Sequence, residues 1–263
     1  VPDEVLKDAK KLAGDRIATA LLTPGKLARE AACKAIQDEI GVKLVEKYGA
    51  EKVTKFTISQ AFYYIQKEAA REMIMTTGKR LDGRGCDDLR ALSSEVGMLP
   101  RAHGSAVFCR GETQAMALAT LGTTEDAQNF DAWTGGQTKK QFLLHYNFPN
   151  FSVGETGRIM GPGRREIGHG ALAERSLEPV IPFDAFPYAI RVTAEIMESN
   201  GSTSMASVCA GTLALMDAGV PITRPVAGIS VGLCSETDDN DVISDYRLLT
   251  DIIGWEDAFG DMD

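Results

Sequence analysis

A strand-like segment, a polar turn and an apolar helix-like segment follow one another between residues 188 and 217. In residues 188–197, apolar side chains alternate with polar or charged ones, a period of two that is typical of a half-buried strand. Residues 205–217 are apolar on nearly every side and rich in small residues. Gly219 and Pro221 follow them, which predicts a buried helix that ends before these residues. The turn between the two segments therefore opens a buried helix.

This turn contains three consecutive hydroxyl side chains, Ser202, Thr203 and Ser204. A helix start has unpaired backbone N–H groups and the positive end of the helix dipole, and both favour an anion. The hydroxyls therefore predict a phosphate site in outline. The alternative is an ordinary helix cap, because Ser, Thr and Asn are the preferred caps of any helix. The turn alone leaves both interpretations open.

Composition sets limits on the class of protein. The chain has 263 residues, 44% of them hydrophobic and 25% charged, which is typical of a soluble globular chain. Its net charge of −9 argues against a nucleic-acid coat held by bulk charge, but a local basic strip could still bind nucleic acid. We expect no membrane partner, because no apolar run approaches the roughly 20 residues of a membrane span. Five scattered cysteines without C-x-x-C spacing indicate a reducing compartment and no structural zinc.

The predicted fold class is α+β in two domains. Residues 1–78 carry apolar stripes at helical spacing, broken at Thr23-Pro24-Gly25, and predict an all-helical domain. From Lys79 onward, Gly-containing turns separate short strand-like runs, with helices expected at about 164–176 and 205–217. Residues 79–263 therefore predict a mixed sheet with helices on its face.

Two arginines and a histidine begin the first of these helices. Arg164 and Arg165 follow Gly163, and His169 lies one turn after Arg165, so the two share a helix face. Paired guanidinium groups suit phosphate oxygens because each forked donor binds two oxygens. The alternative is a solvated pair of surface charges. Similarly, Arg110 and Glu112 indicate either an ion pair close to a site or a structural one.

The last stretch, residues 251–263, carries five acids separated by Gly254 and Gly260. Such a stretch could direct carboxylates at one hard cation, since Mg²⁺ typically takes one or two protein carboxylates. A solvated acidic loop is the alternative, and the phosphate-suited groups above favour the cation site.

These motifs, in this order, resemble the polynucleotide phosphorylase family. The resemblance rests on Lys79–Arg84 (KRLDGR), Leu99–Ala106 (LPRAHGSA), Arg110–Gln114 (RGETQ), Arg164–Gly170 (RREIGHG), Glu198–Ser207 (ESNGSTSMAS), Asp217–Ile222 (DAGVPI) and Glu256–Asp263 (EDAFGDMD). It covers essentially the whole chain. It implies that residues 1–78 form the family's linking helical domain and that residues 79–263 form its second, catalytic ribonuclease-PH-like core.

The resemblance implies phosphorolysis of RNA, in which inorganic phosphate as co-substrate releases nucleoside diphosphates from the 3′ end, reversibly. By match to the family motifs, Ser202, Thr203 and Ser204 hold the attacking phosphate. Asp257 and Asp263 bind Mg²⁺, which Mn²⁺ can replace. Arg164, Arg165 and His169 fall on positions that engage the 3′ end of single-stranded RNA or the phosphate and, with the two aspartates, make the catalytic set.

The family also implies a homotrimer and a place in an RNA-degrading complex that turns over mRNA. A reducing compartment is compatible with the bacterial cytoplasm, which we expect, and with an organelle matrix as the alternative. Two departures stand out. Thr203 replaces a common Ser, and the chain stops at Asp263, where the family continues with an aromatic residue and a Lys, so we expect a core truncated at its C-terminus. Two other functions stay open: a catalytically inactive ribonuclease-PH-like scaffold subunit of an RNA-degrading ring, or a ribonuclease PH that trims tRNA.

Overall fold

The computed structural model describes residues 1–132, 136–158, 160–238 and 242–262. The chain forms two compact units, one of Val1–Leu89 with Val231–Asp263 and the other of Arg90–Ser230. The C-terminal segment thus groups with the N-terminal helices. The domain division predicted from the sequence consists of two continuous segments, 1–78 and 79–263. It stays a prediction.

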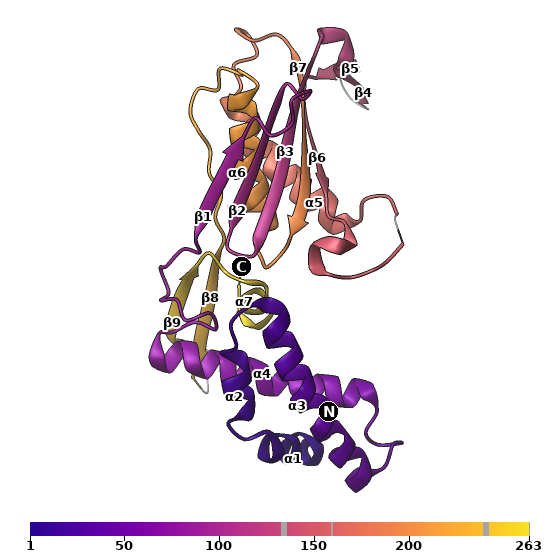
Figure 1. The fold of residues 1–263 in the computed structure, drawn as a ribbon, viewed down its shortest axis with the longest axis vertical. Coiled ribbons are helices and arrows are strands. Elements are labelled where there is room, and N and C mark those ends of the chain that lie inside the picture. Colours follow the sequence, from indigo (N-terminus) through magenta and orange to yellow (C-terminus); the bar gives the residue numbers. More distant parts are fainter. Residues whose placement is uncertain (133–135, 159, 239–241, 263) are drawn as a thin grey trace. The chain divides into compact units, whose positions relative to one another are not determined.

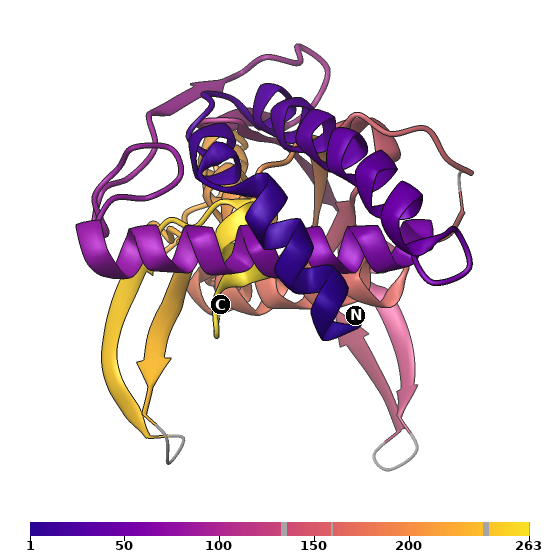
Figure 2. The same cartoon turned by 90° about the horizontal axis from the view of Figure 1, so that it is seen from below.

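The first unit contains the predicted helices, which are α1 (Asp3–Ala13), α2 (Arg16–Leu21), α3 (Lys26–Tyr48) and α4 (Lys55–Thr77) (Figures 1 and 2). Two local features mark the start and the end of α4. The Thr54 hydroxyl accepts a hydrogen bond from the Thr57 N–H at its start, and Gly78 adopts a left-handed φ of 65° at its end. The helices bury one shared core, which includes Ile17, Leu21, Ile40, Leu44 and Phe62. None of the described helices is long and apolar enough to cross a membrane.

The same unit contains an antiparallel hairpin and a short helix that sequence analysis did not predict. The hairpin is β8 (Val231–Thr237) with β9 (Ile243–Thr250), drawn in yellow in Figure 2, and the helix is α7 (Gly254–Phe259). Cys234 and Leu249, from one face of the hairpin, are buried with Ile74 and Met75 of α4. The alternative of a solvated acidic loop over 251–263 is therefore wrong, because α7 occupies its centre and Ile253 and Phe259 are buried.

The second unit contains a five-stranded sheet in the order β1-β2-β3-β7-β6. Only β6 and β7 run parallel among these neighbours, so the sheet is mixed. The predicted strand alternation holds, since Ile190, Val192, Ala194 and Ile196 of β7 are buried. The strands are β1 (Leu92–Val96), β2 (Gly104–Arg110), β3 (Thr113–Gly122), β6 (Phe142–Asn147) and β7 (Ala189–Glu198).

Two helices, α5 (Arg164–Leu177) and α6 (Thr203–Asp217), cover one face of this sheet (Figure 1). Small residues let α6 lie very close to the strands: a Cβ added at Gly104 of β2 would lie 2.2 Å from the Ala214 carbonyl oxygen. These elements confirm the predicted α+β fold with helices on a mixed sheet. A further hairpin and three short 3₁₀ turns complete the unit: β4 (Gln128–Ala132), β5 (Gly136–Lys140), η1 (Thr124–Asp126), η2 (Asn150–Val153) and η3 (Glu178–Val180).

Candidate functional site

The predicted phosphate turn connects the end of β7 to the start of α6. Gly201 and Ser202 both have left-handed backbones, with φ of 86° and 62°. For Ser202 this conformation costs about 1 kcal/mol, so the surrounding contacts must stabilise it. The buried Thr113 hydroxyl accepts from the Asn200 N–H at 3.1 Å and donates to the Gly201 carbonyl at 2.9 Å. Arg90 donates to the Asn200 carbonyl at 2.8 Å. The turn is therefore held at Asn200, directly before its left-handed pair, and at the Gly201 carbonyl within the pair.

Ser202 precedes α6, but its side chain makes no hydrogen bond to the N–H groups of that helix. Its hydroxyl oxygen accepts instead from the Arg110 guanidinium at 2.7 Å. Arg110 is 2% exposed and also donates to the Gly228 carbonyl at 3.0 Å. The ordinary-cap interpretation is therefore wrong for Ser202. The geometry instead adds a buried cation to the positive end of a 15-residue helix.

Thr203 and His169 meet at a residue that sequence analysis did not single out, Tyr146 of β6. The Tyr146 hydroxyl lies 2.7 Å from the Thr203 hydroxyl and 3.4 Å from Nδ1 of His169. The Tyr146 and His169 rings meet edge to face, with centroids 5.4 Å apart. The structure thus brings His169 of α5 to the turn that opens α6. Ser204 is half-buried in that turn.

The two predicted arginines are exposed at the start of α5. The Arg165 guanidinium lies over the Phe148 ring at 5.9 Å from its centroid, and Phe148 stacks on Tyr146 at 6.4 Å. A row of aromatic rings therefore connects Arg165 to the residues around Thr203. Arg164 is the first residue of the helix and is exposed.

Tyr146 could have been found from its strand pattern. Phe142, Leu144 and Tyr146 alternate on the buried face of β6, and a buried Tyr hydroxyl normally requires a polar partner. Burial raises the pKa of Tyr146 to about 12, so the hydroxyl keeps its proton at neutral pH. Glu112, noted with Arg110 in the sequence, accepts a hydrogen bond from the Asn200 amide at 2.9 Å.

Three of the five acids in the C-terminal stretch belong to ion pairs with arginines from residues 71–84. Arg80 donates to Glu256 at 2.8 Å, and both side chains are fully buried. Arg71 makes two parallel hydrogen bonds to Asp261, at 2.8 and 2.9 Å. The third pair joins Arg84 to the buried Asp251 at 3.4 Å. These carboxylates are structural, because the arginines already neutralise them.

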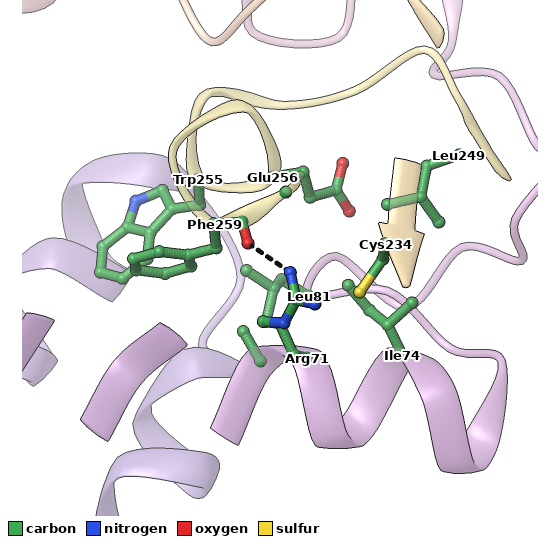
Figure 3. Close-up of a pocket in the computed structure, with 10 residues that line it drawn as sticks. Arg71, Ile74, Leu81, Cys234, Leu249, Trp255, Glu256 and Phe259 are labelled. Atoms are coloured by element: carbon green, nitrogen blue, oxygen red, sulfur yellow. Dashed lines mark hydrogen bonds between the residues drawn. The ribbon is translucent and has the colours of Figure 1, made fainter. Parts of the chain in front are cut away.

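A small cavity lies beside these pairs (Figure 3). Its volume is about 10 Å³, and its lining is mostly apolar, including Ile74, Leu81, Cys234 and Leu249. A space of that size holds at most one water molecule, so it is not a substrate site. Figure 3 also shows Arg71 donating to the Phe259 carbonyl at the end of α7, at 3.1 Å.

Asp257, one of the two predicted metal ligands, is exposed on α7. An exposed carboxylate on a helix fixed by its neighbours fits a hard cation such as Mg²⁺ or Mn²⁺. The other predicted ligand, Asp263, lies outside the described residues. In the described part of the chain, no group of three or more His, Cys, Asp or Glu side chains could hold a metal ion. Asp257 and the phosphate turn belong to different compact units.

Comparison with known proteins supplies the family. The model of the 3′ exoribonuclease family, domain 1, matches residues 88–221, and that of the polyribonucleotide nucleotidyltransferase RNA binding domain matches residues 4–85. Polyribonucleotide nucleotidyltransferase of Akkermansia muciniphila is 55% identical over 262 residues, which are 99% of this chain and 36% of that protein. The proteins of the same name from Opitutus terrae and Methylacidiphilum infernorum are 56% and 52% identical, over 95% and 96% of this chain and 34% and 36% of their own lengths.

The chain spans about a third of the length of these curated relatives. A solved structure of rice Rrp46 aligns with 68% of this chain and 73% of its own, with a TM-score of 0.48 and 22% identity, too distant a likeness to inform the site. The family resemblance expected from the sequence motifs is confirmed by the two family models and by the curated relatives. The chain belongs to the 3′ exoribonuclease family.

Proposed function

We propose that this chain is part of a phosphate-dependent 3′-to-5′ exoribonuclease, a polyribonucleotide nucleotidyltransferase. Inorganic phosphate shortens RNA one nucleotide at a time and releases nucleoside diphosphates, and the reverse reaction extends RNA from diphosphates. The observation that carries the proposal is the start of α6, where Ser202 is held by Arg110 instead of capping the helix. The relatives that cover nearly this whole chain carry the matching name.

In this proposal the turn binds the attacking phosphate. The first N–H groups of α6, the hydroxyls of Ser202, Thr203 and Ser204, and the positive charge of buried Arg110 all favour an anion. One phosphate oxygen bonds to the last internucleotide phosphorus, and the bond from that phosphorus to the preceding 3′ oxygen breaks. The 3′ oxygen then takes a proton. Because inorganic phosphate itself is the nucleophile and the 3′ oxygen of the shortened RNA is the leaving group, positioning and charge neutralisation suffice without a protein nucleophile.

Arg164, Arg165 and His169 would engage the 3′ end of single-stranded RNA. Both guanidinium groups are exposed at the start of α5, where they can reach backbone phosphates, and the ring contact with Phe148 limits the positions of Arg165. His169 is half-buried on the same helix, next to Tyr146. These three residues would therefore hold the RNA end next to the phosphate turn.

Asp257 and Asp263 would hold Mg²⁺ or Mn²⁺. When bound, such an ion offsets the negative charge that develops on the transferred phosphoryl group. The Arg80–Glu256 and Arg71–Asp261 pairs would help to position Asp257 for the metal ion, since they hold α7 near both of its ends. The homotrimer, membership of an RNA-degrading complex that acts on mRNA, and a cytoplasmic location are parts of the same proposal, and the bacterial origin of the relatives supports the last of these.

The test measures products. The chain, and the full-length Akkermansia muciniphila relative carrying this chain in place of its matching segment, are incubated with single-stranded RNA and Mg²⁺, with and without inorganic phosphate. We expect nucleoside diphosphates only when phosphate is present. Nucleoside monophosphates at the same rate without phosphate would indicate a hydrolase, and no product from either protein would favour a scaffold subunit.

A further inference from the structure

Tyr146 occupies a position between the two functional helices. It lies on β6, is 5% exposed, and faces the core that α5 and α6 share with the sheet. Helix α5 approaches it closely, because a Cβ added at Gly170 would lie 3.3 Å from the Tyr146 Cβ. The ring is thus fixed by packing, and its hydroxyl has a defined place.

That hydroxyl connects one residue of each helix. Its distance of 2.7 Å to the Thr203 hydroxyl is the usual length of a good O–H···O hydrogen bond. The 3.4 Å to Nδ1 of His169 is long for such a bond, so the contact with Thr203 is the stronger of the two. A single oxygen atom therefore lies between the phosphate turn and His169.

The contact matters for Thr203 because that side chain is buried, at 3% exposure, and begins α6. A buried hydroxyl is costly to leave without a hydrogen bond, and a β-branched side chain has few rotamers. The Tyr146 hydroxyl therefore favours one rotamer of Thr203 and fixes the position of its hydroxyl at the first residue of α6. Its proton remains bound at neutral pH, so it can donate to Thr203 and leave the Thr203 proton to point elsewhere.

We propose that Tyr146 is a positioning residue for phosphate: its hydroxyl orients Thr203 at the start of α6 and connects the turn to His169. Phosphate bound at the turn and His169 on α5 then respond to each other through this oxygen. The inference rests on the proposed function, because it takes the turn to be the phosphate site. It adds a residue that neither the sequence motifs nor the relatives' names indicate.

Tyr146→Phe tests it by removing one oxygen and keeping the ring. Inorganic phosphate is titrated into the 263-residue chain, and binding is followed by ³¹P line broadening and by the His169 ring signals in NMR spectra. We expect phosphate affinity to fall about five- to tenfold, the effect of losing one hydrogen bond. We also expect phosphate to shift the His169 signals in the parent chain but not in Tyr146→Phe.

Tyr188→Phe is the matched control, because Tyr188 is 48% exposed in the same unit and its ring packs on Phe186. It should leave both readouts unchanged. Should Tyr146→Phe fail to fold, Thr203→Val removes the same hydrogen bond from its other end, and phosphate at saturating concentration should then leave the His169 signals unmoved. A shift of those signals equal to that of the parent would overturn the inference.

Two failures can be told apart. A parent chain that binds no phosphate at the turn removes the proposed function and this inference together. A parent that binds phosphate, with Tyr146→Phe matching it in affinity and in the His169 response, removes the role of Tyr146 alone.

Discussion

The phosphate turn and the acidic C-terminal segment look alike in sequence but are stabilised in opposite ways. Both are polar stretches that follow a strand and lead into a helix, α6 in one unit and α7 in the other. Around Ser202, neutral groups such as Thr113 and Tyr146 hold the turn in place together with two buried arginines, Arg90 and Arg110, which donate to a backbone carbonyl and to a hydroxyl. In residues 251–261, by contrast, arginines neutralise three of the acids.

The difference shows how to interpret such motifs. The turn presents its hydroxyls at a helix start, so most of the polar groups in its motif are available to the one phosphate site that we propose. The acidic segment uses most of its carboxylates in ion pairs with Arg71, Arg80 and Arg84. Arg71, on α4, also donates to the carbonyls of Ser235 in β8 and Phe259 in α7. A count of acids in a sequence therefore overstates the number of metal ligands. Asp257 and Asp263 are proposed as the ligands from the family resemblance, not from this count.

The largest effect should come from the buried pair in the acidic segment. Arg80→Ala leaves Glu256 charged and without its main partner in a fully buried place, which should lower the free energy of unfolding by about 3–5 kcal/mol. Urea denaturation measures it. Arg16→Ala is the control, because the Arg16–Glu39 pair is about half exposed, and it should cost less than about 1 kcal/mol. Equal losses would show that the acidic segment is not held by its buried charges.

The proposed metal ligand should matter for metal and much less for folding. Asp257→Asn keeps the shape of the side chain but removes its charge, and should weaken Mn²⁺ binding about tenfold or more while raising the Mg²⁺ needed for activity. Mn²⁺ affinity is measured by electron paramagnetic resonance in this chain and in the chimera, the full-length Akkermansia muciniphila relative that carries this chain in place of its matching segment. Asp245→Asn, an exposed acid on β9, is the control. Unchanged affinity in Asp257→Asn would end its assignment as a ligand.

The arginines at the start of α5 test the other region. Arg164→Ala with Arg165→Ala should slow phosphorolysis and polymerisation about tenfold each, and Lys at both positions should restore only part, because an ammonium cannot make the forked contact. Rates in both directions are measured on the chimera. Arg175→Ala, exposed on the same helix, should change neither rate. Full recovery of both rates with Lys would show that the two arginines contribute only their positive charge and no forked contact.

The smallest effect concerns the pH dependence of the acidic segment. Burial by itself raises the pKa of Asp261, but hydrogen bonds from Arg71 and Ser235 outweigh it and lower the pKa from 3.8 to about 2. Because the folded pKa is depressed, this stabilisation is present above about pH 4 and is lost as the pH falls toward 2. After allowance for solvent screening it should amount to about 1 kcal/mol.

Denaturation at several pH values checks this last prediction. Asp261→Asn should lower stability at pH 7 and flatten the loss between pH 4 and 2. The parent and Asp261→Asn losing stability in parallel over that range would show that Asp261 does not carry the effect.

Much of the fold could be predicted from local patterns. Helical stripes in residues 1–78, the alternation of β7 and the apolar run of α6 are all sequence signals of the right period. The β8–β9 hairpin was missed because β9 is exposed over most of its length and shows no clear alternation. Helix α7 was not predicted because its stability depends on partners far away in the sequence. Its residue Glu256 pairs with Arg80, which lies 176 residues away.

The same limit applies to the site. Motifs indicated Ser202, Thr203, Ser204, Arg164, Arg165 and His169, which all lie at the starts of two helices on one sheet face, apart from His169 one turn further on. The strand pattern could have indicated Tyr146, and the sequence indicated Arg110, but their partners Thr203 and Ser202 could not be predicted, because these depend on which side chains the fold brings opposite them. The type of a residue indicates which chemistry its side chain can perform, whereas the side chain that it contacts is decided by the tertiary structure.

The most direct test of the central claim, that the turn opening α6 binds phosphate, is a titration of inorganic phosphate followed by backbone amide signals of the chain. We expect the amides of residues 203–205 to shift in a saturable way, and Ser202→Ala with Ser204→Ala to weaken this binding while leaving binding of single-stranded RNA nearly unchanged. Saturable phosphate shifts that map elsewhere, or that survive the double substitution with equal affinity, would contradict the claim.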